Sequence, residues 1–363
     1  MNGFAAKLID RLALSAMNLL KDTRPIRGAL PRGDAPSDLA GVASVARSVK
    51  FSFEDALGRA ELSGIASRAE DYALRPATLV RRRGRSRIRH AWPAPVVRRR
   101  VAFPSPLPGP HDENNTVRGL YYSPTAGGPP PPTVVVLHGY RQVVYGPARF
   151  LARWCAESGW GGMVLALPYH FSRRARGTRS GELMVTPDLG RMLAATRQAV
   201  ADSLAAADML RRAGAPLVAL VGVSLGGWVA ALAAACEADL DAVLLVVPVT
   251  EPAFLVERLA ILKVQRRALL EAGITRHEIE TVLERVTPRN LQPAVEKDRL
   301  FFLYGDHDLV TPPETVDRLW RAWGRPPRAV YPHGHFTLVL LERRLFPEIG
   351  RFLEVRGWSA RAA

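Results

Sequence analysis

The feature that most constrains the fold of this 363-residue chain is a series of short apolar runs separated by helical patterns. The runs have the length of β-strands and are continuous rather than alternating, which is typical of strands covered on both faces of a parallel sheet. They lie at residues 133–138, 163–168, 217–223, 242–249, 300–304 and 329–331. We therefore predict a doubly wound α/β domain with a mostly parallel central sheet and helices on both faces.

The longest helical pattern lies between the second and third of these runs. Thr186 is its expected N-cap, Pro187 takes the first helical position, and the pattern ends before Gly214. Residues 250–292 then interrupt the alternation with two more helical patterns, at 254–271 and 277–286. Ligands bind at the carboxyl edge of such sheets, so we expect this helical insertion to cap that edge.

Changes in the residue pattern along the chain predict three regions. Residues 1–95 are expected to form a helical or irregular extension, residues 96–357 the α/β domain with its insertion at about 250–292, and residues 358–363 a tail. Before the apolar runs, the domain is expected to begin with strands near Val97 to Phe103 and Val117 to Tyr122.

The net charge of +16 is concentrated in one short segment. Residues 81–100 contain no acid and hold nine arginines: Arg81, Arg82, Arg83, Arg85, Arg87, Arg89, Arg98, Arg99 and Arg100. Trp92 is the segment's one aromatic residue, so the stacking platforms of single-strand binders are missing and we expect no nucleic-acid partner. A solvated basic linker is the favoured interpretation, and contact with an anionic membrane surface is the alternative.

Residues 1–22 have the pattern of an amphipathic helix. One face would carry the apolar side chains Phe4, Leu8, Ile9, Leu12, Leu19 and Leu20, and the opposite face Lys7, Asp10, Arg11, Asn18 and Lys21. We expect the apolar face to dock on the protein's own core. The alternative is weak attachment to an anionic membrane surface, together with residues 81–100.

The chemistry centres on the turn Gly222-Val223-Ser224-Leu225-Gly226. A serine needs a base to become a nucleophile, and it must stand clear of the sheet to reach a carbonyl group. A sharp strand-to-helix turn provides this, with small residues two positions before and after the serine. Gly222 and Gly226 meet that demand, and the flanking strand and helix patterns fit the same turn.

The base is expected late in the chain. His335, on the glycine-bearing loop after the last predicted strand, is the best placed of eight histidines, and His333 is the runner-up. A carboxylate must then orient the imidazole. Asp308 follows the strand at 300–304 closely enough to fold back over the edge, and Asp306 is the runner-up. The order serine, acid, histidine is the one expected of this type of fold.

An oxyanion hole needs two N–H groups directed at the developing negative charge. Leu225, directly after the nucleophile, is the first expected donor. Tyr140, in the loop His138-Gly139-Tyr140 after the first apolar run, is the second, with His138 as a brace of that loop.

Residues 97–357 resemble the α/β-hydrolase superfamily through His138-Gly139, the serine turn, Gly305 to Asp308, and Gly334-His335. A narrower likeness, to bacterial relatives of α/β-hydrolase domain-containing protein 18, comes from Leu167-Pro168-Tyr169-His170, Arg176-Gly177 and Ser180-Gly181-Glu182. The resemblance implies an α/β-hydrolase fold. The loop of residues 169–182 is unusually polar, which fits either an anionic feature in the substrate or a surface loop paired with itself.

The leading interpretation is a serine hydrolase that cleaves a carboxylic ester or thioester of an acyl or lipid-like substrate through an acyl-enzyme. Amide cleavage uses the same parts. The alternatives are a non-catalytic binding or scaffold protein and a peripheral membrane lipase. We expect no cofactor and no metal, because no ligand spacing or phosphate-binding loop is present. Two cysteines are too few for a disulfide framework, which favours a cytoplasmic location. Peripheral attachment to the inner membrane face is the alternative location.

Overall fold

The computed structural model describes residues 3–19, 39, 42–47, 52–57, 61–63, 96–142, 145–259, 262–341 and 344–358. Within them, nine strands form one sheet in the order β1-β2-β3-β5-β4-β6-β7-β8-β9. The three pairings from β1 to β5 are antiparallel and the five from β5 to β9 are parallel. The strands are β1 (Glu61–Ser63), β2 (Val96–Pro104), β3 (Thr116–Ser123), β4 (Thr133–Leu137), β5 (Gly161–Leu165), β6 (Val218–Val223), β7 (Ala242–Val246), β8 (Leu300–Gly305) and β9 (Arg328–Tyr331).

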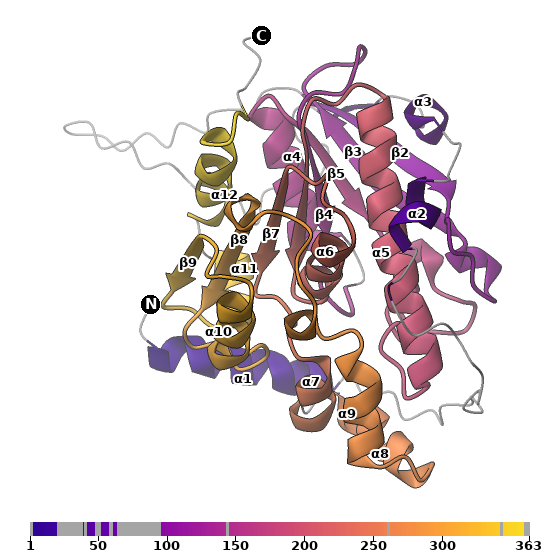
Figure 1. Ribbon diagram of the computed structural model, residues 1–363, viewed down its shortest axis with the longest axis vertical. Coiled ribbons are helices and arrows are strands. Elements are labelled where there is room, and N and C mark those ends of the chain that lie inside the picture. Colours follow the sequence, from indigo (N-terminus) through magenta and orange to yellow (C-terminus); the bar gives the residue numbers. More distant parts are fainter. Residues whose placement is uncertain are drawn as a thin grey trace.

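Helices connect the parallel strands, and a further group of helices lies at one end of the molecule (Figure 1). They are α1 (Gly3–Leu19), α2 (Val42–Arg47), α3 (Phe53–Ala56), α4 (Gly146–Glu157), α5 (Leu189–Arg212), α6 (Leu225–Cys236), α7 (Pro252–Arg258), α8 (Lys263–Glu271), α9 (Arg276–Glu284), α10 (Pro313–Ala322), α11 (His335–Leu341) and α12 (Leu345–Glu354), with short 3₁₀ turns at Asp112–Asn114, Phe171–Arg173, Pro288–Asn290 and Lys297–Arg299. The predicted doubly wound α/β architecture, with a mostly parallel sheet, is confirmed.

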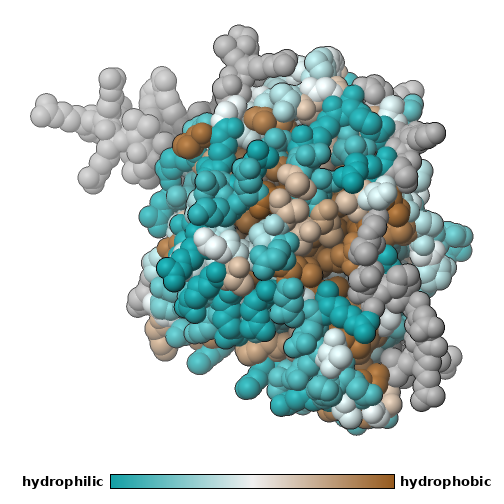
Figure 2. Space-filling model, in the orientation of Figure 1, coloured by the Kyte–Doolittle hydropathy of each residue, from teal (hydrophilic) through white to brown (hydrophobic). Residues whose placement is uncertain are grey.

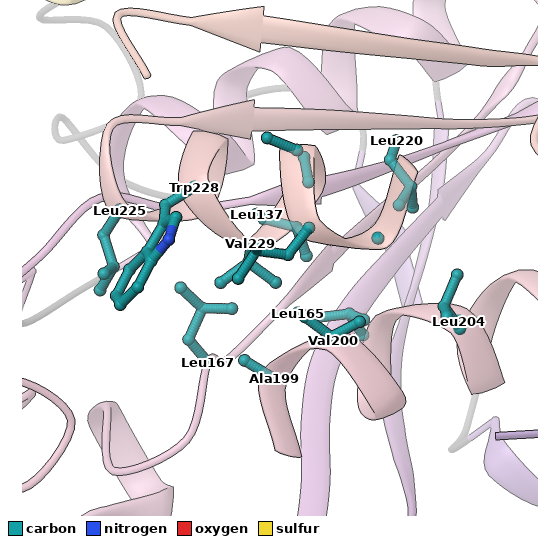
Figure 3. Close-up of a cluster of buried hydrophobic side chains, with 14 of the residues drawn as sticks. Leu137, Leu165, Leu167, Ala199, Val200, Leu204, Leu220, Leu225, Trp228 and Val229 are labelled. Carbon is teal, nitrogen blue, oxygen red and sulfur yellow. The ribbon is translucent and has the colours of Figure 1, made fainter. Parts of the chain in front are cut away.

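Alternate residues of each central strand enter two different cores. On β4, Val135 and Leu137 pack with α5 and α6, whereas Val134 and Val136 pack with α4 and α12. Figure 3 shows the first core, where Leu137 and Leu220 of the sheet lie with Val229 of α6 and Val200 of α5. Hydrophilic residues cover most of the face in Figure 2, with hydrophobic residues gathered near its centre. The continuous apolar runs of β4 to β8 therefore reflect burial on both faces of the sheet, whereas the expected run at 329–331 belongs to the edge strand β9, of which only Tyr331 is buried.

The longest helix begins later than its sequence predicts. α5 starts at Leu189, and its N-cap is Asp188, whose side chain accepts from the N–H of Arg191 (2.9 Å). The expected N-cap, Thr186, instead accepts from the N–H of Asp188 (3.3 Å). An Asp is at least as good a cap as a Thr, so the helix starts at the second of two competing signals.

The helical insertion consists of three helices where two were expected. The predicted helix at 254–271 is divided because Leu259, at the end of α7, has extended backbone angles (φ −72°, ψ 127°). The predicted helix at 277–286 corresponds to α9, which is fixed by a capping box between Thr275 and Glu278. α7, α8 and α9 lie at the end of the molecule where α1 also lies (Figure 1).

The expected orientation of the N-terminal helix is wrong. α1 packs on α11, but Phe4, Leu8 and Leu12 are 77%, 44% and 61% exposed, whereas Asp10 is fully buried. Ala6 is also fully buried, and Ile9, Ala13 and Leu14 are half-buried, so the docked face centres on Ala6 and Asp10 rather than on Phe4, Leu8 and Leu12. The reason is a specific set of hydrogen bonds to Asp10, which a count of apolar side chains does not reveal.

The arginine cluster lies partly outside the described residues. Arg81 to Arg89 belong to the segment 64–95, which the structure does not describe, whereas Arg98, Arg99 and Arg100 lie on β2. In the described part of the chain, no helix is both long enough and apolar enough to cross a membrane.

Candidate active site

Ser224 occupies a strained turn between β6 and α6. Its backbone has φ 56° and ψ −111°, in the positive-φ half of the Ramachandran map, which residues other than glycine rarely adopt. Backbone hydrogen bonds to β7 and the loop after it hold the turn, since Ser224 N–H donates to Val246 O (2.9 Å) and Val249 N–H donates to Ser224 O (3.1 Å). The side chain is half-buried, so the hydroxyl group faces the cavity at the end of the sheet.

The glycines around Ser224 are required by close backbone contacts. A Cβ atom on Gly222 would lie 2.1 Å from the carbonyl oxygen of Gly226, and one on Gly226 would lie 2.2 Å from that of Leu137. A Cβ atom on Gly227 would lie 2.8 Å from Pro248. The turn therefore fits between β4 and β7 only with glycine at the two positions that the sequence singles out.

His335 joins Ser224 to Asp308. Its Nε2 lies 3.0 Å from Ser224 Oγ, and its Nδ1 lies 2.8 Å from Asp308 Oδ2. Both His335 and Asp308 are buried, at 6% and 2% exposure. His335 is the first residue of α11 and Asp308 follows β8, so the carboxyl edge of the sheet brings together three residues far apart in the sequence.

Asp308 is fixed by a compact loop. Its Oδ1 accepts from the N–H groups of Val310 and Thr311 (both 2.7 Å), and Thr311 Oγ1 donates to Oδ2 (2.9 Å). The carboxylate thus has three donors besides the imidazole, and these set its orientation. Sequence reasoning missed the contact from Thr311, although an Asp in a loop commonly accepts from the backbone two residues on, as Asp308 does from Val310.

The two runner-up residues lie elsewhere. His333 packs its ring against Tyr331, with ring centroids 6.4 Å apart. Asp306 is on the outside of the loop, 47% exposed, with Oδ1 3.5 Å from His307 Nε2. Neither is part of the chain of contacts that joins Ser224, His335 and Asp308.

The environment of His335 raises its pKa. Burial alone would lower it, but the charge of Asp308 and its hydrogen bond to the ring act in the opposite direction, and the charge of Asp10 adds to them. The pKa of His335 therefore lies above its ordinary value of 6.5. An imidazole with this pKa accepts a proton readily from a neighbouring hydroxyl group.

The two expected oxyanion donors, Leu225 and Tyr140, line the cavity at Ser224. Leu225 is the first residue of α6, so its N–H lies in the first helical turn, where no intrahelical acceptor exists. Tyr140 and Gly139 both line the cavity, and a Cβ atom on Gly139 would lie 3.6 Å from Ser224 Cβ. His138 is fully buried, and its Nε2 accepts from Leu167 N–H (3.0 Å). Burial, together with the neighbouring His170, lowers the pKa of His138 well below its ordinary value, so this ring is neutral.

A cavity of about 420 Å³ opens at Ser224. Its walls come from α1, α7, α11, the starts of α4, α5 and α6, and the loop of residues 139–142, and they are mostly apolar. Besides His335, the charged side chain among them is Arg141. The apolar walls include Leu14, Trp228, Leu255, Leu259, Val339 and Leu340. This volume and lining are typical of sites for small organic molecules.

The polar loop of residues 169–182 does not face this cavity. Arg173 is fully buried, with Nη2 2.8 Å from Asp202 Oδ2, and it also donates to the carbonyl oxygens of Ala166 and Asn114. Tyr169 and His170 are buried as well. The loop therefore fastens itself to α5, and both expected interpretations of its charges, a substrate contact and a surface loop, are wrong for Arg173.

Sequence reasoning also missed Asp10, which contacts the backbone of the His335 loop. The available signal was its spacing, because Gly3, Ala6 and Asp10 fall on one helical stripe that suits close packing. Among the described residues, no group of three or more His, Cys, Asp or Glu side chains is arranged to hold a metal ion.

Comparison with known proteins gives sequence relatives and structural neighbours. Residues 102–254 match the family model described as alpha/beta hydrolase domain containing 18. An uncharacterized protein of Mycobacterium tuberculosis strain H37Rv is 33% identical over 184 residues, which are 49% of this chain and 43% of that protein. The uncharacterized protein YdjC of Bacillus subtilis strain 168 is 34% identical over 80 residues, 22% of this chain and 69% of YdjC. The chain thus matches less than half the length of the mycobacterial relative.

Two solved structures share the fold. An acetyl xylan esterase from Paenibacillus sp. R4 superimposes with a TM-score of 0.57 at 15% identity, covering 94% of this chain and 99% of the esterase. The acylaminoacyl peptidase of Pyrococcus horikoshii superimposes with a TM-score of 0.55 at 14% identity, covering 73% of this chain and 42% of the peptidase. At such identities the likeness concerns the fold.

Proposed function

We propose that this chain, whose residues 102–254 match the family model described as alpha/beta hydrolase domain containing 18, is a serine hydrolase that cleaves carboxylic esters with an apolar acyl group. The observation that carries this proposal is the continuous chain of contacts from Asp308 through His335 to Ser224, with Ser224 and His335 in the lining of a mostly apolar cavity. In this arrangement the imidazole can remove the serine proton, and the buried carboxylate orients the imidazole, so Ser224 becomes a nucleophile.

The reaction proceeds through two half-reactions. Ser224 Oγ attacks the ester carbonyl carbon while its proton passes to His335 Nε2, and the imidazolium is stabilised by Asp308. The negative oxygen of the tetrahedral intermediate accepts from the N–H groups of Leu225 and Tyr140. Collapse breaks the bond to the alcohol, which leaves with the proton from His335. A water molecule then attacks the acyl carbonyl carbon while one of its protons passes to His335 Nε2. When the second tetrahedral intermediate collapses, the bond from the acyl group to Ser224 Oγ breaks, His335 returns the proton to Ser224 Oγ, and the carboxylic acid is released.

The cavity supports an uncharged acyl group as the substrate feature. Burial of each methylene group contributes roughly 0.8 kcal/mol, so walls such as Leu255 and Leu259 favour longer chains. A charged acyl group would lose its hydration against these walls without a counter-charge, except near Arg141. Thioesters have the same acyl part and are included in the proposal.

A panel of p-nitrophenyl esters of increasing acyl length tests the proposal. We expect kcat/KM to rise from acetyl to medium-length chains and then to fall once the chain exceeds the cavity. Ser224→Ala is the control, and its rate should equal that of the buffer blank. Folded protein that hydrolyses none of the esters would favour the non-catalytic scaffold instead.

The outward face of α1 favours a second candidate, a hydrolase that works at an anionic membrane surface. Phe4, Leu8 and Leu12 are exposed on this face, with the exposed cations Lys7 and Arg11 between them. The one acid of α1, Asp10, points inward. Such a helix lies in the interface of an anionic bilayer, and here its Leu14 also lines the cavity, so an acyl substrate would reach Ser224 from the lipid side.

Vesicle sedimentation separates this candidate from other occupants of the same face. We expect binding to phosphatidylcholine vesicles that contain phosphatidylglycerol, and a loss of at least tenfold in the partition coefficient for the Phe4→Ser, Leu8→Ser double variant. Val355→Ser, at an 84% exposed apolar residue after α12, is the matched control. Vesicle binding that is unchanged in the double variant would contradict the candidate. The candidate would also be contradicted if light scattering showed that the wild type and Val355→Ser are dimers and that the double variant is a monomer.

A further inference from the structure

The side chain of Asp10 joins α1 to the loops that carry His335 and Asp308. Its Oδ2 accepts from the N–H of His335 (2.8 Å) and of Leu309 (3.2 Å), and its Oδ1 accepts from the N–H of Phe336 (3.1 Å). The residue is fully buried. One carboxylate therefore fixes the backbone of the residue after Asp308 and of His335 at the same time.

The surrounding sequence is shaped for this contact. A Cβ atom on Gly334 would lie 2.5 Å from Asp10 Oδ2, so only glycine allows the carboxylate to approach the loop. A Cβ atom on Gly3 would likewise lie 2.3 Å from the ring of His307. Helix α1 therefore meets both loops at glycines, with the His307 ring against Gly3 and the Asp10 carboxylate against Gly334.

We propose that Asp10 is a positioning residue for His335, and that activity depends on α1 being docked. This inference rests on the proposed serine hydrolase function. The hydrogen bond from His335 N–H to Asp10 fixes the backbone from which the imidazole extends, and Asp308 fixes the position of Nδ1 of the ring. Loss of the Asp10 anchor would let the ring move relative to Ser224, and a displacement of about 1 Å in an active site costs on the order of 100-fold in rate.

The charge of Asp10 has a second effect on His335. The charged groups acting on this imidazole are Asp308, from the loop after β8, and Asp10, from α1. Burial raises the pKa of Asp10 itself and so opposes its charged form, while the three N–H donors favour it and the nearby Asp308 disfavours it. Those donors explain how a second carboxylate is accommodated next to Asp308.

A purely structural role for Asp10 predicts a different outcome from a positioning role. If Asp10 only stabilises the fold, Asp10→Ala lowers the melting temperature, and the activity of the remaining folded molecules is unchanged. If Asp10 positions His335, kcat falls with little change in KM, and the pKa of His335 falls because a nearby negative charge is lost. Asp10→Asn keeps one acceptor oxygen without the charge, so it separates the two contributions.

The experiment compares Asp10→Ala, Asp10→Asn and the matched control Ser15→Ala, an exposed polar residue of α1. We expect kcat per folded molecule to fall roughly 10- to 100-fold in Asp10→Ala and less in Asp10→Asn, with KM within about twofold and Ser15→Ala unchanged. If Asp10→Ala does not fold, Asp10→Asn decides. A kcat within twofold of the wild type in the folded variants would overturn the inference.

A second readout does not depend on turnover. The ring of His335 is titrated by NMR in the Ser224→Ala background, with and without Asp10→Asn. We expect its pKa to be lower without the Asp10 charge, and the amides of His335 and Phe336 to exchange faster with deuterium. Unchanged titration and exchange would overturn the inference. Failure of the wild type to turn over any ester would instead refute the proposed function, and this readout would still decide the role of Asp10.

Discussion

His335 Nδ1 lies 2.8 Å from Asp308 Oδ2, and both side chains are shielded from water. The same ring places Nε2 3.0 Å from Ser224 Oγ. In the proposed mechanism, Asp308 stabilises the imidazolium that forms when the serine proton is transferred. Asp308→Asn preserves the shape and removes the charge. We expect kcat to fall by about 10³- to 10⁴-fold with a small change in KM, measured with the best p-nitrophenyl ester.

Asp306→Asn is the matched control for that variant, because Asp306 lies on the same loop but is exposed. Its kcat should stay within about twofold of the wild type. Equal losses in the two variants would mean that Asp308 has no special part in the reaction.

The activity should depend on pH through His335. The protonated imidazole cannot accept the serine proton, so kcat/KM falls as the pH drops through the pKa of His335. Because Asp308 and Asp10 raise this pKa despite burial, the midpoint of the acid limb should lie above pH 6.5. A rate profile from pH 5 to 9 measures it, with circular dichroism as the control for folding. A midpoint at or below 6.5 would show that the two carboxylates do not act as described.

The serine turn should not tolerate a methyl group at Gly222. The added Cβ atom would lie 2.1 Å from Gly226 O, and backbone must move to relieve it. Gly222→Ala should therefore lower the free energy of unfolding by roughly 1–3 kcal/mol and reduce ester hydrolysis by at least tenfold. Gly127→Ala, where nothing lies within 4 Å of the added atom, is the control. Wild-type activity in Gly222→Ala would contradict the geometry of the turn.

Arg173 should matter for stability and not for chemistry. Removal of one partner of a buried ion pair leaves the other charge uncompensated, so Arg173→Met should lower the free energy of unfolding by about 3–5 kcal/mol in urea titrations. The kcat of the folded protein should be unchanged. Arg176→Met, at a side chain that is 96% exposed, should have an effect within about 0.5 kcal/mol. A change in kcat or KM for charged esters in Arg173→Met would restore a substrate role for this loop.

The central sheet could be predicted because its strands are covered on both faces. Each parallel strand from β4 to β8 is a continuous apolar run, so a few consecutive residues are enough to locate it and to indicate that it is buried within a parallel sheet. Ser224 and Asp308 could be placed at one edge because they follow two of these strands, β6 and β8, and His335 because it follows the next parallel strand, β9. Element boundaries were less predictable, as the competition between Thr186 and Asp188 for the start of α5 shows.

The orientation of α1 was not predictable from periodicity. An apolar stripe usually faces the core, but here the hydrogen bonds to Asp10 and the close fit of Gly3 and Ala6 fix the opposite face. These contacts join residues more than 290 positions apart, which local sequence patterns do not report. Likewise, the polar loop at Arg173 was misinterpreted because its partner, Asp202, lies on a different element, α5.

The most direct test of the account is the covalent labelling of Ser224. The folded protein is incubated with a fluorophosphonate, and intact and peptide mass spectrometry locate the adduct. We predict one equivalent of adduct on the peptide that contains Ser224, no adduct in Ser224→Ala, and a labelling rate in Asp308→Asn reduced by at least 100-fold. A folded wild-type protein that takes up no probe, or takes it up equally in Ser224→Ala, would contradict the assignment of Ser224 as the nucleophile.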